Sequence, residues 1–386
     1  MLPTLFRKFL DSEKSGGLLL IICTAVSLIV ANSIWGESYH HFWQIQIGKQ
    51  AVEYWINDGL MAIFFLLIGL ELKREIFIGE LSNIKNALLP IFSAIGGMLV
   101  PAAIYFMFNA GSETQSGAGI PMATDIAFAL GILSLLGNKV PTSLKVFLTA
   151  LAVIDDLGAI LVIAFFYSTG LNWSNLLLAL AIWIVLLILN RLKIRYIFIY
   201  LVGGIIMWWL MLHSGVHATI TGVLLAFAIP FGKGEETSAS YKVQHVLHKP
   251  VAFIILPLFA LSNTAISLEG NLSDVLFKNY SLGIAAGLIL GKPLGIFLLT
   301  IMAVKLNICT LPSDLNKKQL FGVGCLGGIG FTMSIFITLL AFTDTTIINN
   351  AKLVILLASL VSAISGFILL KIFLHKKSQG IITSAL

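Results

Sequence analysis

Continuous apolar runs of roughly 20 residues recur along this chain and are separated by short, charged connections. One run covers 16–34, and another covers 350–374. About 20 apolar residues in a helix are enough to cross the hydrocarbon core of a bilayer. The runs do not alternate between polar and apolar residues, which favours helices over a β-barrel. The sequence therefore predicts an all-α, polytopic membrane protein.

The composition agrees with this prediction. Hydrophobic residues make up 58% of the 386 positions and charged residues only 11%, with a mean hydropathy of +0.98. Soluble domains carry roughly 25% charged residues, and a soluble fold of this length could not cover so much apolar surface. Soluble, disordered and nucleic-acid-binding classes are thereby excluded. The three cysteines give no disulfide framework and no zinc-ligand spacing.

We expect about twelve spans in a single transmembrane domain over 1–386. Their approximate limits are 16–34, 54–78, 87–108, 120–136, 144–168, 174–190, 198–212, 216–231, 248–266, 281–304, 319–343 and 350–374. If alternate connections lie on one side, 20 of the 24 basic residues share the side of the two termini. Only Lys49, Lys278 and Lys352 fall opposite, and Lys292 falls within a span. The excess of basic residues predicts that both termini are cytoplasmic.

The longest external connection, 35–53, contains an alternating segment, Phe42-Trp43-Gln44-Ile45-Gln46-Ile47-Gly48. The alternation predicts a short strand or hairpin on the outer surface. An irregular interfacial loop with an aromatic anchor fits the same pattern, so both readings stay open.

Four ionisable residues lie deep within the expected spans: Asp125, Asp155, Asp156 and Lys292. Each costs about 2.5–3.5 kcal/mol at the bilayer centre on the insertion scale. One buried Asp–Lys pair could simply lock two helices together. Three acids and one base, however, leave carboxylates without a basic partner, which such a structural role does not explain. Asp155 and Asp156 point about 100° apart on a helix, so they can flank a cavity. Carboxylates bind protons and also suit hard cations such as Na⁺, so the two ligands would compete for one site.

Two spans are expected to be interrupted. Gly117, Gly119 and Pro121 precede Asp125 in one, and 322–334 is rich in glycine in the other. Close helix packing alone could explain the glycines. The two spans occupy corresponding places in 87–168 and 281–374, which indicates inverted repeats with an ion site at the breaks. Asp125 could neutralise the positive half-helix ends there, and Lys292 the negative ones.

Seven stretches carry a specific family resemblance from the second span to the eleventh. They are 69–75, 123–131, 154–160, 214–219, 256–260, 291–295 and 328–336. In order and spacing they resemble the bacterial NhaA-type sodium/proton antiporters.

The resemblance implies twelve helices, two interrupted helices that cross at mid-membrane, and electrogenic exchange of cytoplasmic Na⁺ or Li⁺ for external H⁺ by alternating access. Asp155 and Asp156 would bind the cation and the protons, with Thr124 and Asp125 lining or supporting the site. Lys292 would pair with a carboxylate, in particular Asp155, when no Na⁺ is bound. The chain would be a multi-pass inner-membrane protein in contact with lipid, not an enzyme. It would need no cofactor and would dimerise through the first external loop.

Members of the family are also activated at alkaline pH through a cytoplasmic cluster. Its counterparts here are Glu71, Arg74, Glu75, His245 and His248, and His217 matches a residue tied to the same response. Histidine titrates in the right range, although a loop histidine is often merely solvated and the helix-end charges can be local ion pairs. The chain departs from the family pattern at Gln244, where a Glu is usual, so its pH response is expected to be shifted or weak.

Two other functions use similar features. An intramembrane aspartyl protease needs two membrane aspartates, for which Asp125 and Asp155 could serve, but its Gly-x-Gly-Asp signature is absent and Lys292 would have no role. A sodium-coupled symporter of related architecture would need a cavity for an organic substrate.

Overall fold

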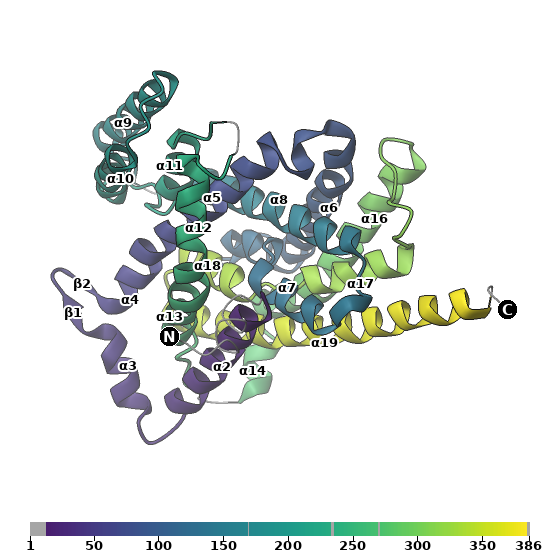
Figure 1. Cartoon of the computed structure of the whole chain (residues 1–386). Coiled ribbons are helices and arrows are strands. Elements are labelled where there is room, and N and C mark those ends of the chain that lie inside the picture. Colours follow the sequence, from purple (N-terminus) through teal and green to yellow (C-terminus); the bar gives the residue numbers. More distant parts are fainter. Residues whose placement is uncertain (1–12, 169, 233–234, 269–270, 384–386) are drawn as a thin grey trace, which may run out of the picture. The chain divides into compact units, whose positions relative to one another are not determined.

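The computed structural model describes residues 13–168, 170–232, 235–268 and 271–383, without the side chains of 13, 14, 138 and 375–383 (Figure 1). Arg7, Lys8 and Lys233, which entered the orientation argument, lie outside the described residues. The described residues are overwhelmingly helical and form two compact units. Unit 1 contains 13–25, 83–159, 266–268 and 271–383, and unit 2 contains 26–82, 160–168, 170–232 and 235–265.

Unit 1 contains the segment 281–374 and, apart from 160–168, the segment 87–168, which the sequence assigns to inverted repeats. The first part holds α6 (Ile84–Asn109), η3 (Gln115–Met122), α7 (Ile126–Leu135), η4 (Gly137–Lys139) and most of α8 (Thr142–Phe166). The second holds α14 (Leu272–Leu276), α15 (Asn279–Ala286), η6 (Gly287–Gly291), α16 (Lys292–Lys305), α17 (Lys317–Gly327), α18 (Phe331–Ala341) and α19 (Thr345–Thr383). Their relation by inversion stays a prediction.

Helices α6 and α16 pack closely along one another. A Cβ on Gly96 would collide with the backbone of Gly295, and the reverse also holds, so glycine at both positions lets the two backbones touch. Further along, the buried hydroxyls of Ser93 and Thr300 hydrogen-bond at 2.6 Å. This contact brings Lys292, at the start of α16, against α6 within the core of unit 1.

Two spans of unit 1 are interrupted, as predicted. Helix η3 ends at Met122 and α7 begins at Ile126, with extended backbone at Ala123 and Asp125. Helices α17 and α18 are separated at 328–330 and bent by 47°. Pro121 withholds a backbone N–H just before the first break, and Asp125 caps the helix that follows it.

Unit 2 is built from the remaining elements. They are the end of α2 (Glu13–Ala31) from Val26 onwards, α3 (Gly36–Gln44), β1 (Gln46–Ile47), β2 (Gln50–Ala51), α4 (Val52–Tyr54), η1 (Trp55–Leu60), α5 (Met61–Phe77), η2 (Glu80–Ser82), the end of α8 from Ile160 onwards, α9 (Trp173–Arg191), α10 (Ile197–Leu212), α11 (Ile220–Ala228), α12 (Ala239–Pro250), η5 (Val251–Ile255) and α13 (Leu256–Asn263). Its core includes the buried side chains of Leu70, Tyr200 and Met207.

The end of α11 is anchored to α5 by a buried lysine. Lys73 is only 4% exposed, and its Nζ donates to the carbonyls of Ala226 (3.2 Å), Phe227 (2.9 Å) and Ile229 (2.6 Å). Lys73, one of the basic residues counted on the side of the two termini, is thus buried at a helix end. Its charge satisfies the last carbonyls of a helix, where a cation is favourable.

The connection 35–53 is mostly helical. The predicted hairpin is present, because 46–51 form a two-stranded antiparallel hairpin. It begins later than the alternating segment, since α3 covers 36–44 and makes Phe42-Trp43-Gln44 helical. Gln46 pairs with Ala51 and Ile47 with Gln50, and Gly48 takes the positive φ of 71° that the tight turn needs.

Eight helices among the described residues are long and apolar enough to cross a membrane, or ten if each of two bent pairs is counted as one span. The chain is thus polytopic. Helices α10 and α11, which match the seventh and eighth expected spans, are shorter, with 16 and nine residues. The count of twelve stays a prediction.

Candidate ion-binding site

Asp155 and Asp156 lie in the middle of α8, within unit 1, and each is only 1% exposed. They follow one another on a regular helix, so their side chains leave the axis about 100° apart. Asp155 faces the two helix breaks, as its contacts show.

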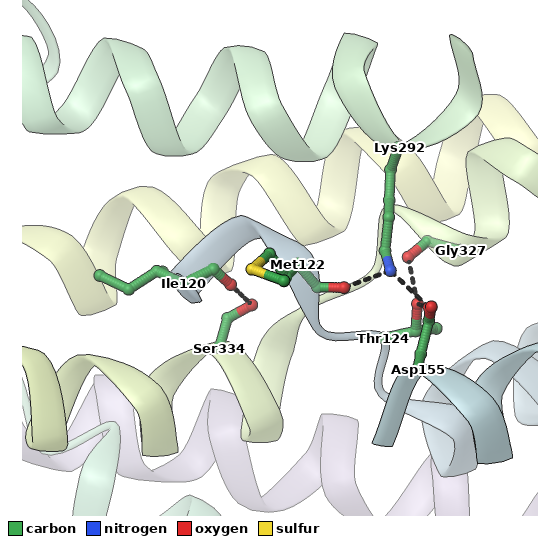
Figure 2. A network of polar contacts seen from close by, with 7 residues as sticks. All are labelled: Ile120, Met122, Thr124, Asp155, Lys292, Gly327 and Ser334. Carbon is green, nitrogen blue, oxygen red and sulfur yellow. Dashed lines mark hydrogen bonds and ion pairs between the residues drawn. The ribbon is translucent and has the colours of Figure 1, made fainter. Parts of the chain in front are cut away.

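Asp155 forms a buried ion pair with Lys292 (Figure 2). Lys292 Nζ lies 2.5 Å from Asp155 Oδ2, and neither side chain is exposed. The same ammonium donates to the carbonyl of Met122, the last residue of η3. Lys292 therefore serves a carboxylate and the negative end of a half-helix at once, as expected from the sequence.

Thr124 connects Asp155 to the second break. Its hydroxyl lies 2.8 Å from Asp155 Oδ2 and 2.8 Å from the carbonyl of Gly327, where α17 ends. One hydroxyl carries one proton, so these two acceptors share a single donor. Asp155 Oδ1 is buried and accepts no hydrogen bond from the described residues. It is thus an available acceptor for a proton or a cation.

Asp125 caps two helices at once. Its Oδ1 accepts from the N–H of Phe128 at 2.9 Å, in the first turn of α7. Its Oδ2 accepts from the N–H and the hydroxyl of Thr332, at 3.1 and 2.5 Å, in the first turn of α18. A carboxylate is favourable at the positive end of a helix, and Asp125 occupies two such ends, which agrees with the expectation from the sequence.

The two breaks also bond to each other directly. Asp125 N donates to the carbonyl of Ile329 at 2.7 Å. The Ser334 hydroxyl donates to the carbonyl of Ile120 at 2.7 Å, as Figure 2 shows. Unpaired backbone groups in a membrane cost several kcal/mol each. The interruption in each span is therefore stabilised by the other.

Three of the residues expected to respond to pH gather on α5 in unit 2. Arg74 and Glu75 form an ion pair at 3.3 Å, and Glu75 also accepts from the N–H of Glu80. The side chains of Glu71 and of Gln244, on α12, lie close enough to interact. Gln244, where the family resemblance led us to expect a Glu, thus lies beside this cluster.

The histidines are placed differently. His245 is exposed and stacks on Tyr241, with ring centroids 6.2 Å apart and planes at 3°, and His248 is exposed on the same helix, α12. His217 lies near the start of α11, with a ring nitrogen 3.1 Å from the carbonyl of Tyr167. Lys73 contacts the other end of α11, so the helix separates His217 from that end.

Sequence reasoning missed three polar residues. Thr332 binds Asp125, Lys73 caps α11, and Asp58 is a half-buried acid in the span that begins at Val52. The sequence does carry a signal for Asp58, because it lies next to Asn57 at the start of the apolar run 54–78. In the structure the Asn57 side chain accepts from Asn263 at 2.7 Å. Thr332 lies inside a family-like stretch but is only one of many membrane hydroxyls.

Comparison with known proteins identifies the family. The family model described as Na⁺/H⁺ antiporter 1 matches residues 7–370. The Na⁺/H⁺ antiporter NhaA of Flavobacterium psychrophilum is 69% identical over 367 residues, which cover 95% of this chain and 96% of that protein. The Na⁺/H⁺ antiporter NhaA of Cytophaga hutchinsonii is 60% identical over 98% of this chain and 98% of that protein. The Na⁺/H⁺ antiporter NhaA of Dechloromonas aromatica is 56% identical over 97% of each chain. The chain is therefore a multi-pass membrane protein that belongs to the Na⁺/H⁺ antiporter 1 family.

Proposed function

We propose that the protein is an electrogenic antiporter that extrudes Na⁺ or Li⁺ in exchange for external H⁺. The observation that carries this proposal is the buried ion pair between Asp155 and Lys292 at two facing helix breaks. A buried charge pair of this kind is costly and marks ion pathways in membrane proteins. The relatives named as Na⁺/H⁺ antiporters supply the identity of the ions.

The exchange follows from competition for the same carboxylates. A cation that binds between Asp155 and Asp156 would displace the Lys292 ammonium from Asp155. The protons released would be those held by the displaced Lys292 ammonium and by the Asp156 carboxyl group. Protons returning from the other side would restore the ion pair and expel the cation. Each loaded form permits the switch between inward-open and outward-open states.

Oxygen ligands for the cation are at hand. Na⁺ prefers hard oxygen donors, and Thr124 places a hydroxyl at Asp155. Among the described residues no cluster of three or more His, Cys, Asp or Glu is positioned for a metal ion. We propose that the cation combines the two carboxylates with hydroxyl or carbonyl oxygens and that the exchange needs no cofactor.

The regulatory and assembly features belong to the same proposal. Glu71, Arg74, Glu75, His245, His248 and His217 would tune activity to alkaline pH, with Gln244 modifying the response. The protein would lie in the bacterial inner membrane with both termini in the cytoplasm, surrounded by lipid. It would dimerise through the hairpin at 46–51 and serve Na⁺ and pH homeostasis.

Reconstituted vesicles test the exchange. The purified protein is placed in proteoliposomes with a preset ΔpH, and Na⁺ or Li⁺ is added between pH 6.5 and 8.5 while a pH-sensitive dye is followed. The wild type is expected to dissipate ΔpH on addition of either cation, and Asp156→Asn to abolish the response. Asp274→Asn, which removes an exposed carboxylate on α14, is the matched control. Full Na⁺-driven proton movement by Asp156→Asn would overturn the proposal.

A further inference from the structure

We propose that Ser359 of α19 is a positioning residue for cation binding, acting through the start of α18. This inference rests on the proposed function, because the readout is Na⁺ affinity. Ser359 lies outside all the motifs and charged positions discussed above, on a long apolar helix where a serine attracts no notice.

The start of α18 lacks a cap from its own chain segment. Its N-cap position is Gly330, which has no side chain to accept a hydrogen bond. The first N–H groups of a helix have no partner within the helix, and inside a membrane they must find one elsewhere. Two residues far apart in the sequence supply the missing acceptors.

Ser359 supplies one of these acceptors. Its hydroxyl oxygen accepts from the N–H of Gly330 at 3.2 Å and from the N–H of Phe331 at 3.1 Å. The next N–H, that of Thr332, bonds to Asp125. Ser359 is only 3% exposed, so water cannot easily replace it. Two neighbouring N–H groups of one helix end therefore depend on a single hydroxyl.

A chain of bonds leads from Ser359 to the candidate site. Ser359 accepts from the N–H groups of Gly330 and Phe331. The next residue, Thr332, donates to the Asp125 carboxylate, and the Asp125 N–H donates to the carbonyl of Ile329. The residue before Asp125 is Thr124, whose hydroxyl contacts Asp155. Ser359 touches neither carboxylate of the candidate cation pair, so its effect on them is through this chain of contacts.

Loss of the hydroxyl has a defined electrostatic sign. Without Ser359 the N–H dipoles of Gly330 and Phe331 would point unpaired into the break and add positive potential. Positive potential disfavours a cation nearby. The more positive start of α18 would also attract the Asp125 carboxylate, which already accepts from Thr332, more strongly. Both effects weaken Na⁺ binding more than they change the rate of the loaded transporter.

The chain offers a matched control on the same helix. Ser362 is 1% exposed, and its hydroxyl makes no hydrogen bond with the described residues. Ser362→Ala therefore makes the same chemical change at the same depth of burial without uncapping α18. Ser359→Thr keeps the hydroxyl and is the conservative variant.

The experiment measures KM and maximal rate for Na⁺ in proteoliposomes, per amount of folded transporter, for the wild type and these variants. Ser359→Ala is expected to raise KM about tenfold, the equivalent of one lost hydrogen bond, with the maximal rate changed less than twofold. Ser362→Ala should match the wild type, and Ser359→Thr should restore KM to within about threefold of it.

Other outcomes are equally decisive. An unchanged KM in folded Ser359→Ala, or an equal rise in Ser362→Ala, would overturn the inference, because packing alone would then explain the result. If Ser359→Ala does not fold, Ser359→Cys decides: its weaker acceptor should give a KM above that of Ser359→Thr, and equal values would refute the role. A wild type without Na⁺-driven proton movement would instead refute the proposed function.

Discussion

The carboxylate of Asp125 holds both the backbone N–H and the hydroxyl of Thr332, a residue 207 positions further along the chain. The two residues lie at the starts of different half-helices, α7 and α18. One negative charge thus stabilises two positive helix ends and fixes the distance between them.

Thr332→Val keeps the shape of the side chain and the backbone N–H but removes the hydroxyl. The short bond to Asp125 is lost, and we expect the free energy of unfolding to fall by about 1–3 kcal/mol, since a buried charged acceptor loses a donor. Denaturation in detergent followed by tryptophan fluorescence measures the change. Thr338→Val is the control, because the Thr338 hydroxyl bonds only to Ser334 of its own helix. An equal loss in both variants would contradict a special role for the Asp125 contact.

The ion pair of Asp155 and Lys292 should show strong coupling in a double-mutant cycle. Lys292→Met alone leaves a buried carboxylate without its cation and is expected to cost about 3–5 kcal/mol of stability. Adding Asp155→Asn removes the uncompensated charge, so the double variant should be more stable than Lys292→Met. Thermal unfolding of the purified proteins provides the four values. Lys305→Met, at the exposed end of α16, should leave stability unchanged. Additive losses would mean that the pair is not coupled.

Lys73 is expected to stabilise the folded protein through its hydrogen bonds to the end of α11. Lys73→Met leaves three carbonyl contacts at the end of α11 without their donor, at a cost of about 1.5–3 kcal/mol for a charged hydrogen-bonding group. Lys73→Arg should retain part of the stability. The melting temperatures of both variants are compared with that of Lys85→Met, which removes an exposed lysine. A wild-type melting temperature in Lys73→Met would exclude the capping role.

Gln244→Glu tests how the chain-specific amide affects the pH response. The new carboxylate would face Glu71 in place of an amide donor. Two facing carboxylates give up their protons at higher pH than one does. If deprotonation activates the transporter, as proposed above, the rising limb of the activity profile should move to more alkaline pH by on the order of one pH unit. Na⁺-driven ΔpH dissipation between pH 6 and 9 gives the profile.

The exchange of both side chains provides the control for that experiment. Glu71→Gln combined with Gln244→Glu again leaves one carboxylate and one amide in contact, so the midpoint should return towards the wild-type value. A shift that persists in the double variant would show that the position, not the pair of like charges, sets the pH response.

The sequence predicted those parts of the structure that depend on local chemistry. Apolar runs located the spans, and Pro121 with the glycines of 322–334 located the two breaks. The four intramembrane charges stood out because each is costly in lipid. Three of them, Asp125, Asp155 and Lys292, proved to contact the breaks or each other in unit 1.

The remaining contacts could not be read from sequence because they depend on which elements meet. Lys73 looks like any lysine at the end of a membrane helix until α11 is placed against α5. Thr332 and Ser359 are ordinary hydroxyl residues in apolar helices, where serine and threonine commonly bond to their own backbone. Only the three-dimensional neighbours show that Ser359 caps the start of α18 and that Thr332 donates there to Asp125.

The hydrogen bond from Asp125 N to the carbonyl of Ile329 has a consequence for how the protein is made. The first break leaves the ribosome about 200 residues before its partner, and at 5–20 residues per second that interval is roughly 10–40 s. Throughout it, the extended backbone at 123–125 has no partner from the second break and is costly to expose to lipid. Biogenesis must therefore keep the span of η3 and α7 in a different, better-satisfied conformation, or shield it within the insertion machinery, until the span of α17 and α18 arrives.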